Sequence, residues 1–280
     1  MSIEGLDDLK KMSLSAREQI IRLAQNGGCF LGSAFSCIDI IVYLYERFLR
    51  LTDEDRDYFF LSKGHAVPAL YSVLSLQGYI DINWIDHHLN PYSYYYYHPN
   101  ISVNGVEFHS GSLGHLPSVA LGVAIDQRLR GDKGRSVVLV GDGELNEGSV
   151  WETLLIAGSM RLSNYILIVD RNRLQANMQT ESLIRLEPLA QRLMSFGFNV
   201  IEVDGHDFEE LSSAFDDSSF SDEKPQAIIA HTVRGKGIPS FEKRLDRWFV
   251  RLTKDEVYDV INELYATSEI ASVLINCEGR

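Results

Sequence analysis

The sequence predicts an α/β fold: a doubly wound, mostly parallel sheet with helices on both faces. Short apolar runs typical of buried strands alternate with segments of helical periodicity through most of the 280 residues. Polar residues follow directly after two of these runs, as is usual where ligands bind at the carboxyl edge of a parallel sheet. The chain is long enough to bury a full core.

Two helices are expected in residues 13–50, because apolar residues recur there at helical spacing. The sequence NGGCFLGS interrupts them, and its glycines indicate a bend or a close backbone approach. DYFFLS is then expected to form a short buried strand, and KGHAVPALYSVLSLQG a turn that leads into a helix.

Residues 87–115 are expected to form a long surface loop, because this polar, tyrosine-rich segment shows little periodicity. Such a loop is usually functional or disordered, and the aromatic content argues against disorder, so a lid or an interface is expected. Helical periodicity returns in residues 117–131, where Pro117 suits a first turn and Gly131 suits the end of a helix.

The second half of the chain is expected to continue the alternation. Apolar strands at residues 136–140 and 165–169 flank a helix. Later segments follow in the order helix, strand, helix, strand: PLAQRLMSFG, NVIEVDG, DFEELSSAF and QAIIAHT. The pattern breaks near residues 233–250, and residues 252–274 are expected to form one or two terminal helices. One domain is predicted over residues 1–280, with residues 241–280 as a C-terminal helical extension.

The composition argues against several classes of partner. A net charge of −13 disfavours nucleic acid and anionic membranes. The N-terminus lacks the apolar core of a signal peptide and no run is long enough to cross a bilayer, so a cytoplasmic protein is expected. The three cysteines, Cys29, Cys37 and Cys277, have no metal-ligand spacing and are expected to be reduced, packed thiols.

The clearest chemical signal is the pair Asp142 and Asn172, each of which follows a predicted strand. In a parallel sheet both would emerge at the same edge. A carboxylate and an amide oxygen, joined by a main-chain carbonyl from the following turn, suit Mg²⁺ or Ca²⁺ and leave positions open for phosphate oxygens. Gly141 and Gly143 let the backbone approach a bulky anion near the start of a helix. The implied ligand is a metal-bound diphosphate.

This stretch resembles the GDG…N signature of thiamine diphosphate enzymes, and its detail (GDGELNEG, the Trp-Glu pair, DRNRLQ) is similar to the transketolase family. The resemblance runs in order through residues 15–240. It implies the diphosphate-binding, PP-type domain of that fold, with thiamine diphosphate and Mg²⁺ (or Ca²⁺) as cofactors. Asp142, Asn172 and the carbonyl of Leu174 would hold the metal.

The resemblance also implies residues around the cofactor. In LSKGHAVPALYSVL, His65 matches a histidine near the phosphates and the substrate, and in YHPN, His98 matches a second histidine that contacts the substrate. In SGSLGH, Gly111 and Leu113 match cofactor-contact positions. Each of these segments could instead be an ordinary turn or loop. The remaining histidines, His206 among them, are expected to be surface or satisfied core residues.

Acidic residues of the central stretch complete the predicted site. Gly141, Gly143 and Glu144 are expected to contact the cofactor together with Glu147, and Glu152 matches an acid at the subunit interface. Most helical glutamates are simply solvated, which is the alternative. We expect Glu152 to help link two cofactor sites across a dimer.

Two positions depart from the family pattern. The Gly-His-Pro-Gly-like turn is replaced by CFLG, so Phe30 stands at a substrate-side histidine position. The Trp-His-Gly-like element is replaced by WFV, which places Phe249 at a second one. Imidazole exchanges protons near neutral pH and donates hydrogen bonds to sugar hydroxyls, whereas phenylalanine does neither. A drier pocket and a substrate other than an ordinary sugar phosphate are therefore expected.

Single-chain family members carry a further pyrimidine-binding domain, so a separate partner subunit is expected here, in an α2β2 assembly. The predicted activity is transfer of a two-carbon ketol or acyl unit from a donor ketose or ketoacid to an acceptor carbonyl. One alternative is an acyloin-forming or decarboxylating enzyme of a specialised pathway, and another is a non-catalytic scaffold subunit. A dinucleotide-binding domain is disfavoured, because no GxGxxG follows the first strand.

Overall fold

A computed structural model describes residues 3–268 apart from residues 53, 217–218 and 221–222. Its centre is a five-stranded sheet in the order β1-β2-β3-β7-β6, and each neighbouring pair is parallel. The strands are β1 (Tyr58–Leu61), β2 (Ser136–Gly141), β3 (Tyr165–Arg171), β6 (Asn199–Asp204) and β7 (Gln226–His231). The predicted parallel sheet is confirmed, with β2 and β3 extending slightly beyond their predicted ends.

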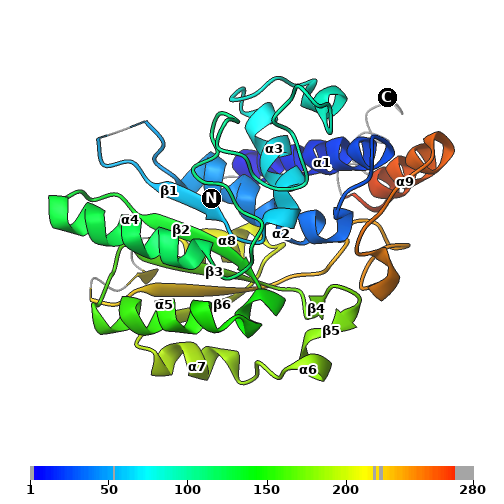
Figure 1. Cartoon of the computed structure of the whole chain (residues 1–280). Helices are drawn as coiled ribbons and strands as arrows, with labels where there is room; N and C mark the ends of the chain where they lie inside the picture. The colour runs from blue at the N-terminus through cyan, green and yellow to red at the C-terminus, as the bar shows by residue number, and fades with distance from the viewer. Residues whose placement is uncertain (1–2, 53, 217–218, 221–222, 269–280) are drawn as a thin grey trace.

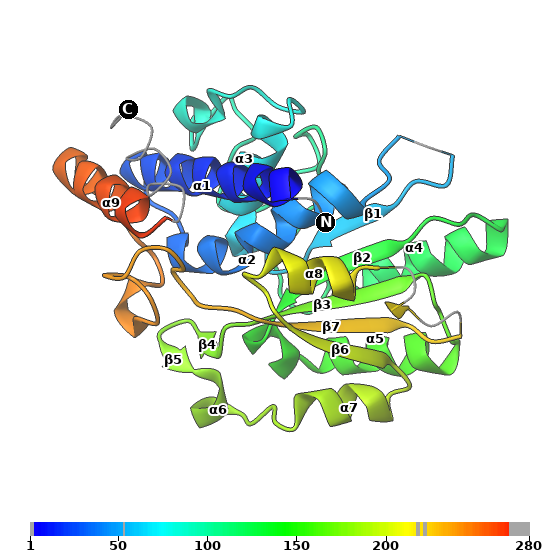
Figure 2. The ribbon, with the colours of Figure 1, turned by 180° about the vertical axis from the view of Figure 1, so that it is seen from behind.

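Helices cover both faces of the sheet, as Figures 1 and 2 show. One face is covered by α1 (Ile3–Gln25), α2 (Leu31–Tyr43), α3 (Val67–Leu76), α8 (Phe208–Ala214) and α9 (Lys254–Thr267). The other face is covered by α4 (Leu116–Arg130), α5 (Gly148–Ser159) and α7 (Leu189–Ser195). The sheet is therefore doubly wound, as predicted.

The side chains of the central strands alternate between two hydrophobic cores. In β2, Val137 and Leu139 pack into the core on the side of α1, α2 and α3, whereas Val138 and Val140 pack into the core on the side of α4 and α5. This two-sided burial explains why the strands read as continuous apolar runs. Every residue of α2 is buried, because α2 contacts α1, α3 and α8 at once.

Local sequence signals set several helix ends. Helix α4 has Pro117 in its first turn and ends at Gly131, which has φ 78°. The side chain of Asp207 caps α8. Thr253 and Glu256 form a reciprocal capping box at the start of α9.

The remaining expectations for the fold are largely met. Residues 88–115 contain no helix or strand, as predicted for the long loop. Cys29 and Cys37 are buried free thiols, while Cys277 and the rest of the predicted terminal helix lie outside the described residues. The sequence interpretation missed the short hairpin of β4 (Leu174–Gln175) and β5 (Met178–Gln179) and the following α6 (Thr180–Leu183). Within the described part of the chain, no helix is long and apolar enough to cross a membrane.

Gly158 of α5 lies directly against the main chain at Phe196. A Cβ added at Gly158 would lie 1.7 Å from the carbonyl oxygen of Phe196, and main-chain atoms cannot swing aside as a flexible side chain can. We expect Gly158→Ala to lower the free energy of unfolding by about 1–3 kcal/mol, the usual cost of overpacking, in urea denaturation.

Gly122→Ala is the matched control, because a Cβ at Gly122 of α4 would meet no atom within 4 Å. Alanine is the better helix former, so this variant should be more stable than the unmodified chain by up to about 1 kcal/mol. Equal stability of the two variants would contradict the close packing of α5 on Phe196.

Candidate functional site

The carboxyl ends of four neighbouring strands meet around a cavity of about 310 Å³. Lys63 and His65 follow β1, Asp142 follows β2, Asn172 follows β3, and Arg234 follows β7. The chain leaves β3 for the outer strand β6 and then returns to β7 beside β3. The cavity therefore lies where the strand order reverses, which is the usual ligand position in a doubly wound sheet.

Most of the site residues predicted from the sequence are brought together here. Those that line the cavity are His65, Leu113, Gly141, Asp142, Gly143, Glu144, Glu147, Asn172 and Leu174. His98, Gly111 and Glu152 are not part of the lining.

The buried carboxylate of Asp142 is held through both of its oxygens. Oδ1 accepts a hydrogen bond from the main-chain N–H of Gly143 (2.8 Å). Oδ2 accepts one from Nη1 of Arg171 (3.0 Å) and one from the main-chain N–H of Arg173 (2.6 Å). Burial, followed by the charge of Asp170, raises the pKa of Asp142 to about 6, although Arg171 acts in the opposite direction.

Asn172 shapes the turn that follows β3. Its Oδ1 accepts a hydrogen bond from the main-chain N–H of Leu174 (3.0 Å), and Arg173 between them has φ 66°. Within the described residues, no group of three or more His, Cys, Asp or Glu side chains could hold a metal ion. A cation in this cavity would therefore depend on mixed oxygen donors, namely one carboxylate, one amide and a main-chain carbonyl.

Glu144 lines the cavity and also joins three of its walls. Its Oε1 accepts hydrogen bonds from Oγ of Ser62, after β1, and from the main-chain N–H of Gly114 (2.8 Å). Its Oε2 accepts one from the main-chain N–H of Gly141 (3.2 Å). Burial raises the pKa of this carboxyl. Glu144 therefore holds the ends of β1 and β2 against the loop that precedes α4.

Two imidazoles lie close to each other at this edge. Nε2 of His65 is 2.8 Å from Oγ of Ser33. Burial, followed by the nearby charge of Lys63, lowers the pKa of His65 to about 3, so this side chain is neutral near neutral pH. His98 lies beside Gly111, where an added Cβ would be 3.5 Å from the ring, and burial lowers its pKa as well.

The two glutamates of α5 lie further out. Glu147 occupies the N-cap position at the rim of the cavity and is exposed. Glu152 is exposed on the outer surface of α5, on the same helix as the exposed apolar side chains of Leu155 and Ile156. A role for Glu152 between subunits stays a prediction.

The sequence interpretation missed a buried ion pair beneath the cavity. Nζ of Lys63 donates to Oδ2 of Asp170 and to the carbonyl of Ser33 (3.0 Å), and neither charged side chain is more than 1% exposed. Oγ of Ser36 (2.6 Å) and Oγ1 of Thr232 also donate to Asp170. A charge at the end of an apolar strand was the available signal, since buried charges are normally paired.

Arg234, also missed, is buried but keeps unpaired donors. Its Nη1 donates to the carbonyl of Ala176 (2.5 Å), while Nε and Nη2 have no partner among the described residues. Burial lowers its pKa to about 10, which leaves the guanidinium charged at neutral pH. Oδ1 of Asn146, in the same cavity, likewise lacks a partner in the described part of the chain. Buried polar atoms are rarely left unpaired, so this cavity suits a ligand with both anionic and cationic groups.

Aromatic rings surround His65 on its other side. The Phe30 ring lies 5.5 Å from the His65 ring, 4.9 Å from Trp248 and 5.1 Å from Phe249, measured between centroids. Tyr97 lies 6.4 Å from Phe30 and 5.8 Å from Phe249. Phe30 and Phe249, the two departures from the family pattern, thus meet in one aromatic cluster.

A family model described as transketolase, thiamine diphosphate binding domain, matches residues 17–269. The chain belongs to the transketolase family. One of the named subunits of the apulose-4-phosphate transketolase of Phocaeicola vulgatus is 32% identical over 264 residues, which cover 92% of this chain and 93% of that protein. The 6-deoxy-6-sulfo-D-fructose transketolase subunit SqwG of a Clostridium species is 30% identical over 94% of this chain and 98% of that protein.

The fold of a solved transketolase agrees with this assignment. The transketolase of Leishmania mexicana superposes with a TM-score of 0.83 at 25% identity over 91% of this chain. This transketolase-family chain matches only 41% of that longer protein, in contrast to its nearly full match with the two subunit relatives. The predicted family and its thiamine diphosphate-binding domain are confirmed.

Lys63→Met tests the buried ion pair, because it leaves the Asp170 carboxylate without its cation. We expect the free energy of unfolding to fall by about 3–5 kcal/mol in urea denaturation, as when one partner of a buried pair is removed. The double variant Lys63→Met/Asp170→Leu removes both charges and should recover much of this loss. A double variant as unstable as Lys63→Met would contradict this explanation.

Proposed function

We propose that this chain is the diphosphate-binding subunit of a two-component, thiamine diphosphate-dependent transketolase-like enzyme. The observation that carries the proposal is the buried guanidinium of Arg234, whose Nε and Nη2 are unpaired among the described residues, in the cavity that also contains Asp142 and Asn172. A cation–diphosphate pair would satisfy these groups together. The family match over residues 17–269 supports thiamine diphosphate as its source.

The residues of the cavity fit this cofactor. Asp142, Asn172 and the carbonyl of Leu174 would hold Mg²⁺ or Ca²⁺, and Arg234 would pair with the diphosphate. Gly143 leaves the necessary space, because a Cβ there would lie 2.7 Å from Cγ of Gln175. Gly141 and Gly143 follow or end β2 at the start of a helical turn, where main-chain N–H groups favour an anion.

When bound, thiamine diphosphate supplies the carbanion chemistry that breaks and re-forms a bond next to a carbonyl. The chain's own residues bind and orient. Ser33 fixes the neutral imidazole of His65, which can offer one hydrogen bond to a substrate oxygen without carrying a charge. His98 lies close enough to influence the pKa of His65 and would provide a second polar contact on that side.

The reaction proposed is transfer of a two-carbon ketol or acyl unit from a donor ketose or ketoacid to an acceptor carbonyl. Both relatives are named as transketolase subunits, one for apulose 4-phosphate and one for 6-deoxy-6-sulfo-D-fructose. These names support a sugar-derived donor. They also support a separate partner subunit, which would supply the pyrimidine-binding domain in an α2β2 assembly.

The whole chain is proposed to act as one cofactor-binding domain with residues 241–280 as a C-terminal extension. The packing of α9 on α1 and the bridge between Cys29 and Val250 support this organisation. Glu152, together with exposed Leu155 and Ile156, is proposed to face another subunit.

The aromatic cluster favours a second candidate function, an acyloin-forming or decarboxylating enzyme. Phe30 and Phe249 offer no hydrogen bonds to hydroxyl groups, so this side of the site suits a donor with few of them, such as a 2-oxoacid. Assaying ketose phosphates against 2-oxoacids as donors separates the two functions. Efficient turnover of a common ketose phosphate would exclude the second candidate.

The partner is identified by purifying the tagged chain from its native cell with thiamine diphosphate and Mg²⁺ present. We expect mass spectrometry to find a stoichiometric companion chain with a pyrimidine-binding domain. If no companion co-purifies and no cofactor is retained, the scaffold alternative is favoured instead.

Asp142→Ala tests the metal site, because it removes the only carboxylate proposed to bind the cation. We expect cofactor affinity to fall by more than the roughly 10–100-fold typical of outer-sphere partners, measured by calorimetric titration with thiamine diphosphate and Mg²⁺. Co-purification of the partner should persist. Unchanged function in a correctly assembled Asp142→Ala complex would mean that the chain is a non-catalytic scaffold.

A further inference from the structure

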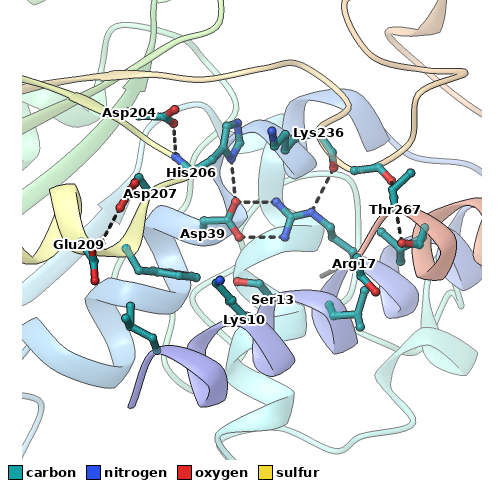
Figure 3. Close-up of a pocket in the computed structure, with 16 residues that line it drawn as sticks. Lys10, Ser13, Arg17, Asp39, Asp204, His206, Asp207, Glu209, Lys236 and Thr267 are labelled. Carbon is teal, nitrogen blue, oxygen red and sulfur yellow. Dashed lines mark hydrogen bonds and ion pairs between the residues drawn. The ribbon is translucent and has the colours of Figure 1, made fainter. Parts of the chain in front are cut away.

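A second cavity, of about 590 Å³, is lined by residues that follow Arg234 in the same loop (Figure 3). Three buried polar side chains from distant parts of the chain meet there: Arg17 of α1, Asp39 of α2 and His206, which follows β6. None of the three lines the cofactor cavity. They form a network whose purpose the proposed function does not explain.

The network is centred on the carboxylate of Asp39. Nη1 and Nη2 of Arg17 donate to its two oxygens (2.8 and 2.6 Å), and Nδ1 of His206 lies 2.7 Å from Oδ2. Burial opposes ionisation of Asp39, but Arg17 and His206 together hold the pKa of this carboxyl well below its usual range. The carboxylate is therefore charged and paired on both sides.

His206 uses its other nitrogen to hold the main chain beside Arg234. The N–H of Val233 donates to Nε2 of His206 (2.8 Å). A ring nitrogen that accepts a hydrogen bond carries no proton, so the proton of this neutral imidazole lies on Nδ1, toward Asp39. Asp39 thus determines that Nε2 is available as an acceptor for Val233.

Two more hydrogen bonds hold the same loop. Nε of Arg17 donates to the carbonyl of Lys236 (3.2 Å), a contact visible in Figure 3. The N–H of Gly235 donates to the carbonyl of Gly32 (3.1 Å), and Gly235 has φ 80°, a conformation that favours glycine. The main chain is therefore anchored on both sides of Arg234.

This anchoring matters because few contacts orient the Arg234 guanidinium itself. Its Nη1 donates to the carbonyl of Ala176, and Nε and Nη2 stay unpaired within the part of the chain that the structure describes. The direction of the side chain thus depends on the path of the main chain that carries it. A loop displaced by even a small distance would move the charge away from the diphosphate.

We propose that Arg17, Asp39 and His206 are positioning residues for Arg234 and thereby set the affinity of the chain for the cofactor's diphosphate. They touch neither the cofactor nor the substrate. They act through the main-chain contacts at Val233 and Lys236. The inference rests on the diphosphate-binding role proposed for Arg234.

Two substitutions of His206 separate its two contacts. His206→Gln places an acceptor near the position of Nε2 and loses the contact with Asp39. His206→Asn keeps a donor near the position of Nδ1 and loses the acceptor for Val233. We expect His206→Asn to weaken binding of magnesium pyrophosphate and of thiamine diphosphate with Mg²⁺ by about tenfold, the effect of one hydrogen bond. His206→Gln should lose less than about threefold.

Both affinities are measured by calorimetry on the full chain, and the thermal unfolding midpoint of each variant confirms that it is folded. Arg17→Lys provides an independent variant in case His206→Asn does not fold. It keeps a cation beside Asp39 but removes the Nε donor to Lys236, so it should also weaken pyrophosphate binding. Unchanged affinity in a folded His206→Asn chain would overturn the proposal.

A double-mutant cycle with Arg234→Gln shows whether the network acts through Arg234. We expect His206→Asn to weaken binding in the unmodified chain and to have no further effect in the Arg234→Gln background. An equal loss in both backgrounds would overturn the positioning role while leaving the cofactor site intact. If the unmodified chain binds neither magnesium pyrophosphate nor thiamine diphosphate, the proposed cofactor role of the cavity fails, and this inference fails with it.

Discussion

The site depends above all on the buried carboxylate of Asp170 at the end of β3. Asp170 has no solvent exposure, and it accepts hydrogen bonds from Lys63 after β1, Ser36 in α2 and Thr232 after β7. Because each bond is made where water is excluded, losing one partner would leave a charge or a polar group unsatisfied. Two residues beyond Lys63, Asp170 and Thr232, along each segment, stand residues that line the cavity: His65, Asn172 and Arg234.

Buried carboxylates recur as supports around this site. Glu144 joins the ends of β1 and β2 to the loop before α4, and Asp39 joins α1 and α2 to the loop that carries Arg234. A carboxylate suits this task because it accepts several hydrogen bonds at once. The result is a local concentration of cationic and N–H donors in a chain whose net charge is −13. An anionic ligand is therefore attracted by the site and not by the molecule as a whole.

The two sides of the site differ in chemistry. The diphosphate side presents Arg234, Asn146 and the turn after β2, which are polar and, among the described residues, partly unpaired. The other side presents His65 within a group of aromatic rings that includes Phe30 and Trp248. Cofactor binding and substrate choice are thus assigned to different parts of the chain. This separation lets a family cofactor site coexist with a substrate that carries few hydroxyl groups.

Local patterns in the sequence determined the strands, most helices and the residues around Asp142 and Asn172, because apolar periodicity and turn chemistry extend over only a few residues. They could not reveal that Lys63 meets Asp170, 107 positions away, or that His206, expected to be an ordinary surface or core residue, holds the main chain next to Arg234. They also missed the two-residue strands β4 and β5, which are too short to be periodic. Only the tertiary structure decided which buried charges are paired and which stay free for a ligand, because pairing depends on distances between segments remote in the chain.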